Sequence, residues 1–105
     1  MSLAPLSDDE LRAARARATE ARRHRARVKD DLRRGQVSLA DVLDLARTDD
    51  VVAQTRVVDV LKCLPRVGDK KARAAMSRLD IAENRRLRGL GRHQVKGLKD
   101  EFGDD

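Results

Sequence analysis

The sequence predicts an all-α protein, with a long helix in residues 1–35 followed by a small helical globule in residues 36–105. No segment alternates apolar and polar residues as a half-buried strand does. Apolar residues instead recur at intervals of three and four, which is the spacing of one helix face. Two serines precede an acidic residue by three positions, at Ser7 with Glu10 and at Ser38 with Asp41, and such capping boxes mark helix starts.

The first helix is expected to run from Asp8 to about Arg34 and to end at Gly35, with Leu6 and Leu11 as a hydrophobic staple at its start. Its middle consists mainly of alanine and arginine, so it offers little apolar area to a core. This part of the helix is therefore expected to project from the globule or to lie on a ligand.

The globule is predicted to contain five further helical segments. They run from Leu39 to about Arg47, from Asp50 to Gln54, from Arg56 to Leu64 with Thr55 as its cap, from Asp69 onward, and from Arg92 to about Phe102. The third of these is the predicted spine of the core, because its apolar residues point in several directions. Only 1% of the residues are aromatic and 40% are charged, so the core is small.

Basic and acidic residues are segregated along the chain, although the net charge is only +6. Residues 11–35 contain 10 Lys and Arg against 3 Asp and Glu, and residues 56–99 contain 13 against 4. Residues 36–55 hold one Arg and four Asp. Two basic blocks around an acidic one indicate separate positive surfaces, as in proteins that bind nucleic acid on defined faces.

A turn between two predicted helices has the features of a phosphate site. Pro65 ends one helix, and Gly68 is expected to supply a positive φ just before the next helix begins at Asp69. A helix N-terminus has unpaired amides and a partial positive charge, and both attract phosphate. Basic side chains of residues 66–71 surround this turn, so the expected ligand is a polyanion.

A second turn about twenty residues later combines glycines with clustered arginines. Such a cluster is often only a solvated surface, but its position beside the first turn favours a clamp for a phosphate backbone. The predicted nucleic-acid contacts are Arg66, Gly68, Lys70, Lys71, Arg73, Arg85, Arg86, Arg88, Gly89, Gly91 and Arg92.

The first helix is a candidate for a second contact with nucleic acid, through Arg22, Arg23, Arg25 and Arg27. The alternative is a solvated helix that only its C-terminal third holds to the globule. A membrane-surface helix is disfavoured, because alanine buries too little apolar area for that role.

Three runs carry a resemblance to a known family, namely LPRVGDKKARAAMSRLDIA and NRRLRGLG within residues 61–91 and ARRHRARVKDDLRRG before them. The first two look like the helix-two-turn-helix motif of the actinobacterial-type integration host factors, and the third looks like the helix that precedes it. The resemblance implies a monomeric or loosely associating protein that binds double-stranded DNA with little sequence preference, bends or compacts it, and assists a site-specific recombinase in the nucleoid. It assigns DNA contacts to Gly68 and to the Arg-Arg-x-Arg-Gly element that begins at Arg85.

Enzyme chemistry finds little support in the residues. His24 and His93 have no Ser, Cys or carboxylate partner in a recognisable motif and are expected to be surface histidines. There is no nucleotide-binding loop and no metal-ligand spacing, and Cys63 has no second cysteine, so no cofactor, metal or disulfide is expected. No apolar run approaches 18 residues, and the expected location is the cytoplasm.

Backbone amides and clustered cations recognise phosphates rather than base edges, so low sequence specificity is expected. Aromatic platforms for unstacked bases are nearly absent, which favours a duplex over a single strand. Two alternatives remain open at this point. One is a structured-RNA or ribosome-associated protein that uses the same turn, and the other is an adaptor whose Arg-rich helix binds an acidic protein.

Overall fold

The computed structural model describes residues 7–102, and helices account for all of the regular structure in that range. The elements are α1 (Asp8–Arg33), α2 (Leu39–Leu45), α3 (Asp50–Ala53), α4 (Val57–Leu61), α5 (Asp69–Arg78), a short 3₁₀ turn η1 (Leu87–Gly89) and α6 (Arg92–Phe102). The one strand-like contact among the described residues is an isolated antiparallel bridge between Arg56 and Arg86. The prediction of an all-α fold is confirmed.

Helix α1 begins and ends as local sequence signals predict. The Glu10 amide donates to Ser7 Oγ at 3.1 Å, and the Ser7 amide donates to Glu10 Oε1 at 3.3 Å, which completes the capping box. At the other end Gly35 has a φ of 72°, and the Gln36 amide donates to the Asp31 carbonyl at 2.8 Å. The expected staple between Leu6 and Leu11 involves residue 6 and lies outside the described residues.

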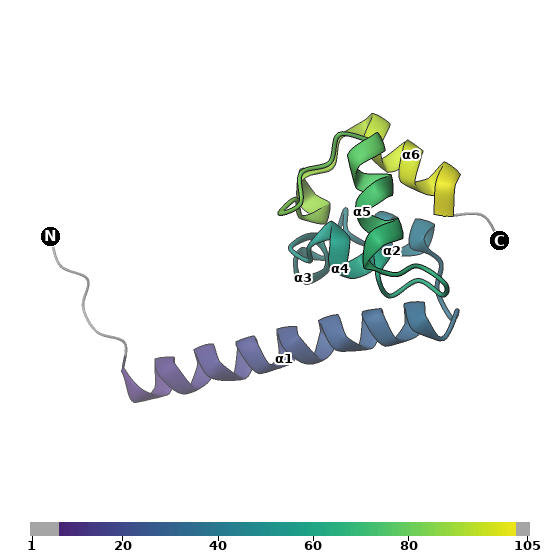
Figure 1. Cartoon of the computed structure of the whole chain (residues 1–105). Helices are drawn as coiled ribbons and strands as arrows, with labels where there is room; N and C mark the ends of the chain where they lie inside the picture. Colours follow the sequence, from purple (N-terminus) through teal and green to yellow (C-terminus); the bar gives the residue numbers. More distant parts are fainter. Residues whose placement is uncertain (1–6, 103–105) are drawn as a thin grey trace, which may run out of the picture.

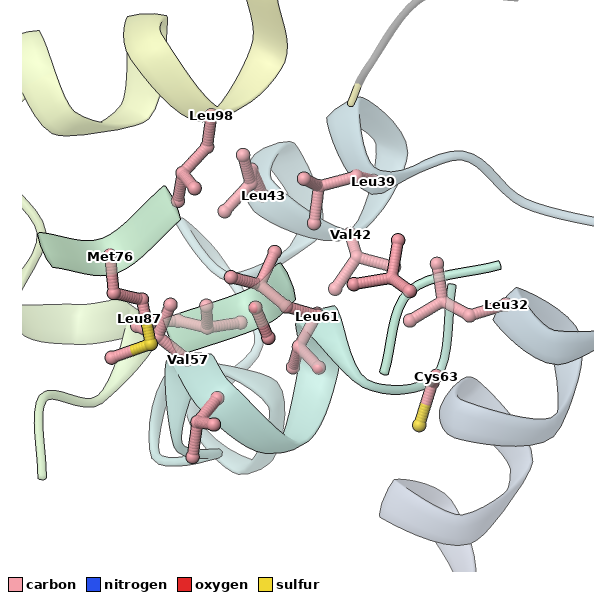
Figure 2. Close-up of a cluster of buried hydrophobic side chains, with 14 of the residues drawn as sticks. Leu32, Leu39, Val42, Leu43, Val57, Leu61, Cys63, Met76, Leu87 and Leu98 are labelled. Carbon is pink, nitrogen blue, oxygen red and sulfur yellow. The ribbon is translucent and has the colours of Figure 1, made fainter. Parts of the chain in front are cut away.

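Helix α1 contacts the globule in two places. It packs against α3, and its C-terminal end enters the core. Figure 1 shows α1 running beneath the globule, with its N-terminal half extending past the globule's edge. Leu32, near the end of α1, is fully buried and enters the core beside Val42 and Cys63 (Figure 2). The helix is thus anchored at one end and free of the core at the other.

Leu61 lies at the centre of the core and is fully buried (Figure 2). Helix α4, which carries it, packs on α5, while α2 packs on both α3 and α6. The residues predicted to form the spine are buried as expected, namely Val57, Val58, Val60 and Leu61. Since each buried aliphatic side chain contributes about 1.5–3 kcal/mol, this short helix supplies a large share of the core energy.

Helix α4 is shorter than predicted, and its expected cap was wrong. It ends at Leu61 because Cys63 and Leu64 continue only as tighter turns, with amides that donate three residues back rather than four. Thr55 does not cap it, since its hydroxyl donates to the Val51 carbonyl at 3.2 Å.

The turn before α5 also differs from the prediction in one respect. Gly68 has a φ of −94° in extended backbone, so it does not supply the positive φ that was expected of it. The left-handed residue is Arg66, with a φ of 67°. This conformation places Val67 in the core, 8% exposed, and lets the Val67 amide donate to the Leu64 carbonyl at 3.1 Å. Burial of Val67 offsets the backbone strain at Arg66.

Gly35→Ala is expected to lower the free energy of unfolding by about 1 kcal/mol, because a Cβ is disfavoured at a φ of 72°. Gly35→Asn serves as the matched control and is expected to lose less, because asparagine tolerates the left-handed region better. Urea denaturation followed by circular dichroism measures both. Equal losses for the two variants would show that φ at residue 35 does not limit stability.

Candidate nucleic-acid interface

The N-terminus of α5 presents backbone amides that no other group satisfies within residues 7–102. Gly68 is the N-cap and has no side chain to accept from them, so the amides of Asp69, Lys70 and Lys71 stay available to an external acceptor. Arg66, Lys70 and Lys71 are exposed and have no acidic partner among the described residues. We call these amides and the three cations the α5 site. Its amides and its charge both suit an anion.

Arg73 was also predicted to contact nucleic acid, but its guanidinium is engaged by carboxylates of the protein. Its Nε lies 3.0 Å from Asp69 Oδ1, and its Nη1 lies 2.6 Å from Glu83 Oε1. The hydrogen bonds that Arg73 donates to Asp69 and then to Glu83 raise its pKa above the ordinary value. Its charge is therefore balanced locally, unlike the cations of the α5 site.

Residues 85–89, here called the Arg85–Gly89 segment, are held against the junction of α3 and α4 by backbone hydrogen bonds. The Val57 amide donates to the Arg85 carbonyl and the Leu87 amide donates to the Thr55 carbonyl, both at 2.9 Å. Leu87 is buried beneath the segment. These contacts fix the backbone from which three arginines emerge.

The three arginines of this segment are arranged differently. Arg85 Nη1 donates to the Gly89 carbonyl at 2.6 Å, and Arg86 Nη1 donates to the Gln54 carbonyl at 2.5 Å. Arg88 is exposed and lies 3.6 Å from a carboxylate oxygen of Asp50. An open hollow of about 430 Å³ lies among them, lined by Gln54, Asn84, Arg85, Arg86, Arg88 and Gly89.

Two glycines near this hollow have distinct structural roles. A Cβ at Gly89 would lie 2.7 Å from Cδ of Arg85, so glycine lets the Arg85 side chain fold back over the turn. The Gly91 amide donates to Gln94 Oε1 at 2.8 Å, across the first turn of α6. Arg92, the first residue of α6, is exposed beside it.

The four arginines predicted on α1 do not share one surface. Arg23 pairs with Glu20, and Arg22 donates to the Thr19 hydroxyl. Arg27 lines the groove between α1 and α3. Arg25 alone of the four lines a hollow that also includes Arg86.

That hollow includes two basic residues that were not predicted, Lys29 of α1 and Arg56 at the start of α4. Lys29 follows Arg25 by four residues, and this helical spacing was a signal that could have found it. Arg56 reaches the same place only through the bridge to Arg86, which the sequence does not reveal.

His24 is not the free surface histidine that was expected. Its Nε2 lies 2.6 Å from Asp49 Oδ2, and both side chains are partly buried between α1 and α3. Asp49 is also the N-cap of α3 and accepts from the Val52 amide at 3.1 Å. This contact joins α1 to the globule well before the helix reaches the core at Leu32. His93 is exposed, as expected.

The environment of Asp49 favours its carboxylate form. Partial burial acts to raise the Asp49 pKa, but the amides of Val52 and Val51 and the His24 side chain together outweigh it. The pKa of Asp49 therefore lies below its ordinary value of 3.8.

The helices, the turn before α5 and the exposed cations together define a helix-two-turn-helix protein. The family described as the S13-like H2TH domain matches residues 32–102. A solved structure of sIHF bound to an 8bp palindromic DNA is similar, with a TM-score of 0.81, 42% identity, and coverage of 84% of this chain and 99% of that one.

Two similar proteins identify the family of this chain more narrowly than the domain match does. The integration host factor of Mycobacterium tuberculosis (strain ATCC 25618 / H37Rv) is 46% identical over 98% of both chains. That of Streptomyces coelicolor (strain ATCC BAA-471 / A3(2) / M145) is 42% identical over 98% of this chain and 96% of its own. The chain belongs to the integration host factor family.

Two kinds of feature are absent from the part of the chain that the structure describes. No helix there is long and apolar enough to cross a membrane. No group of three or more His, Cys, Asp or Glu side chains within residues 7–102 could hold a metal ion. Cys63 is a free, buried thiol whose Sγ contacts the Asp59 carbonyl.

Asp49→Asn is expected to lower stability at neutral pH by up to about 1 kcal/mol, because asparagine keeps the cap but loses the charge beside His24. A depressed pKa stabilises the fold above the unfolded-state pKa, and this contribution is lost as pH falls through the folded-state pKa. The difference between wild type and variant should therefore shrink below about pH 4. Urea denaturation between about pH 7 and pH 3 measures it, and a constant difference over that range would contradict the assignment.

Proposed function

We propose that this protein binds double-stranded DNA through its phosphate backbone, with low sequence specificity, as an architectural protein of the nucleoid rather than an enzyme. The observation that carries the proposal is the α5 site, where amides and three cations that have no partner within residues 7–102 meet at one helix end. Phosphate oxygens match both features. The Arg85–Gly89 segment supplies a second set of cations.

Low sequence specificity follows from the chemical groups that the protein presents to DNA. The α5 site has amides and flexible cations, which contact phosphates and carry no base information. Sequence preference then arises from groove width and from how easily the duplex deforms. Bending or compaction of DNA, and assistance to a site-specific recombinase, are the roles proposed for a monomer of this kind.

Structured RNA is the alternative ligand for the same turn. The similar sIHF structure holds DNA, which favours a duplex of DNA over RNA. The one aromatic residue of the sequence, Phe102, is half-buried at the end of α6, so no described aromatic side chain is offered to unstacked bases. An acidic protein partner for α1 is the third candidate.

Salt dependence of affinity tests the proposal. Affinity for a random duplex of about 20 base pairs should fall with log salt at a slope of about −0.9 per phosphate contacted, with on the order of five contacts. Fluorescence anisotropy from about 50 to 200 mM salt, with a structured RNA of equal charge as comparator, provides the measurement. Tighter binding of the RNA would select the ribosomal alternative, and a flat slope would select the adaptor.

Gly68→Ser should weaken DNA binding while leaving the fold as stable as before or slightly more stable. A Cβ at residue 68 meets no atom within 4 Å, and a serine hydroxyl at an N-cap accepts from the first-turn amides. That hydroxyl competes with a phosphate for the same donors, so affinity should fall by roughly fivefold at moderate salt.

Gly68→Ala is the matched control, because it adds the Cβ without the hydroxyl. It should bind DNA better than the serine variant although it is less stable, since alanine is a poor N-cap. Anisotropy and urea denaturation give the two readouts. Binding that simply follows stability across the pair would argue against amide recognition at α5.

A further inference from the structure

A basic hollow of about 230 Å³ lies where α1 passes the Arg85–Gly89 segment. It is lined by Arg25, Lys29, Gln54, Thr55, Arg56, Asp59 and Arg86. The lining comes from three separate parts of the chain, namely α1, the start of α4 and the segment that contains Arg86. We call it the α1–α4 hollow.

Charge in the α1–α4 hollow is strongly one-sided. Four cationic side chains line it against a single carboxylate, that of Asp59, whose Oδ2 lies 3.1 Å from Arg56 Nε. Arg25 and Lys29 have no acidic partner among residues 7–102. Like charges gathered around one space repel each other, and an anion in that space relieves the repulsion.

Two of the cations are held in place by contacts that do not depend on a ligand. A backbone bridge joins Arg56 and Arg86, the Arg56 side chain is paired with Asp59, and the Arg86 side chain donates to the Gln54 carbonyl. On the side of α1, the contact of His24 with Asp49 lies next to Arg25 in sequence and anchors that turn of the helix. Such preorganisation lowers the entropic cost of binding.

The α1–α4 hollow also continues the surface already described. It shares Gln54 and Arg86 with the hollow among Arg85, Arg88 and Gly89. Arg86 therefore stands between two adjoining basic hollows. A polyanion bound in one hollow therefore lies next to the other.

We propose that the α1–α4 hollow binds one phosphate group of a DNA backbone, as a subsite separate from the α5 site. This inference rests on the proposed function and deepens it, because it assigns phosphate contacts to Arg25, Lys29, Arg56 and Arg86. It also means that α1 contacts DNA through the turns beside the globule and not through its projecting half.

Removal of the α1 cations tests the subsite in the full chain. Arg25→Ala with Lys29→Ala should reduce the magnitude of the salt slope by about 0.9 and weaken duplex affinity roughly fivefold, which corresponds to one phosphate contact. The matched control is Arg12→Ala with Arg15→Ala, which removes the same charge from two exposed residues nearer the N-terminus of α1. The control should leave the slope unchanged.

A charge-preserving exchange, Arg25→Lys with Lys29→Arg, should restore the slope. Circular dichroism establishes that each variant keeps its helix content. If both alanine pairs lower the slope equally, the effect is general attraction and the subsite is wrong. If wild type binds no duplex at all, the proposed function itself fails, which is a distinguishable result.

NMR of the arginine Nε–Hε groups distinguishes a phosphate of DNA from a free phosphate ion as the ligand. Addition of the duplex should shift the signals of Arg25 and Arg86 and leave that of Arg15 in place. A response of Arg25 and Arg86 to inorganic phosphate alone, with none to duplex, would overturn the assignment and indicate a site for a free anion.

Discussion

Two backbone hydrogen bonds hold the surface of this protein to its core. Val57 donates to the Arg85 carbonyl and Leu87 donates to the Thr55 carbonyl, each at 2.9 Å. Both donors carry buried side chains, so the pairing is protected from water on its inner side. Arginine side chains repel each other, so a cluster of them needs a rigid backbone beneath it. The buried residues Val57 and Leu87 provide that backbone here. The basic hollows form because this pairing brings residues 56 and 86 together.

The distribution of ion pairs divides the basic residues into two groups. Some arginines, such as Arg73 and Arg78, pair with acids of the protein and stabilise its surface modestly. Other basic residues, including Lys70 and Lys71, have no acidic partner within residues 7–102. The overall charge of +6 therefore underestimates the charge that a polyanion meets locally.

Features encoded by neighbouring residues could be predicted from the sequence. The capping box of Ser7 and Glu10 and the stop at Gly35 involve residues at most five apart, so the bounds of α1 followed from local chemistry. The apolar pattern of α4 likewise identified the core. The α5 helix start at Asp69 was correct for the same reason.

Features that depend on contacts between distant residues could not be predicted. The positive φ lies at Arg66 and not at Gly68, because burial of Val67 decides the turn. Thr55 failed as a cap for a local reason instead, since its hydroxyl donates to the carbonyl of Val51, four residues before it. The contact of His24 with Asp49 joins residues 25 apart. At the candidate site, most of the cationic residues could be predicted from the sequence. Which of them lie together could not, because that depends on the fold.

The way the helices α1 to α5 start has a consequence for the α5 site. Ser7, Ser38 and Asp49 close the starts of α1, α2 and α3 with their own side chains. The first amide of α4 is taken by the Arg85 carbonyl. Helix α5 begins at a glycine and receives no such closure within the described residues. A phosphate bound there would complete the helix, so hydrogen exchange at the first amides of α5 would slow on binding even if no atom of the fold moved.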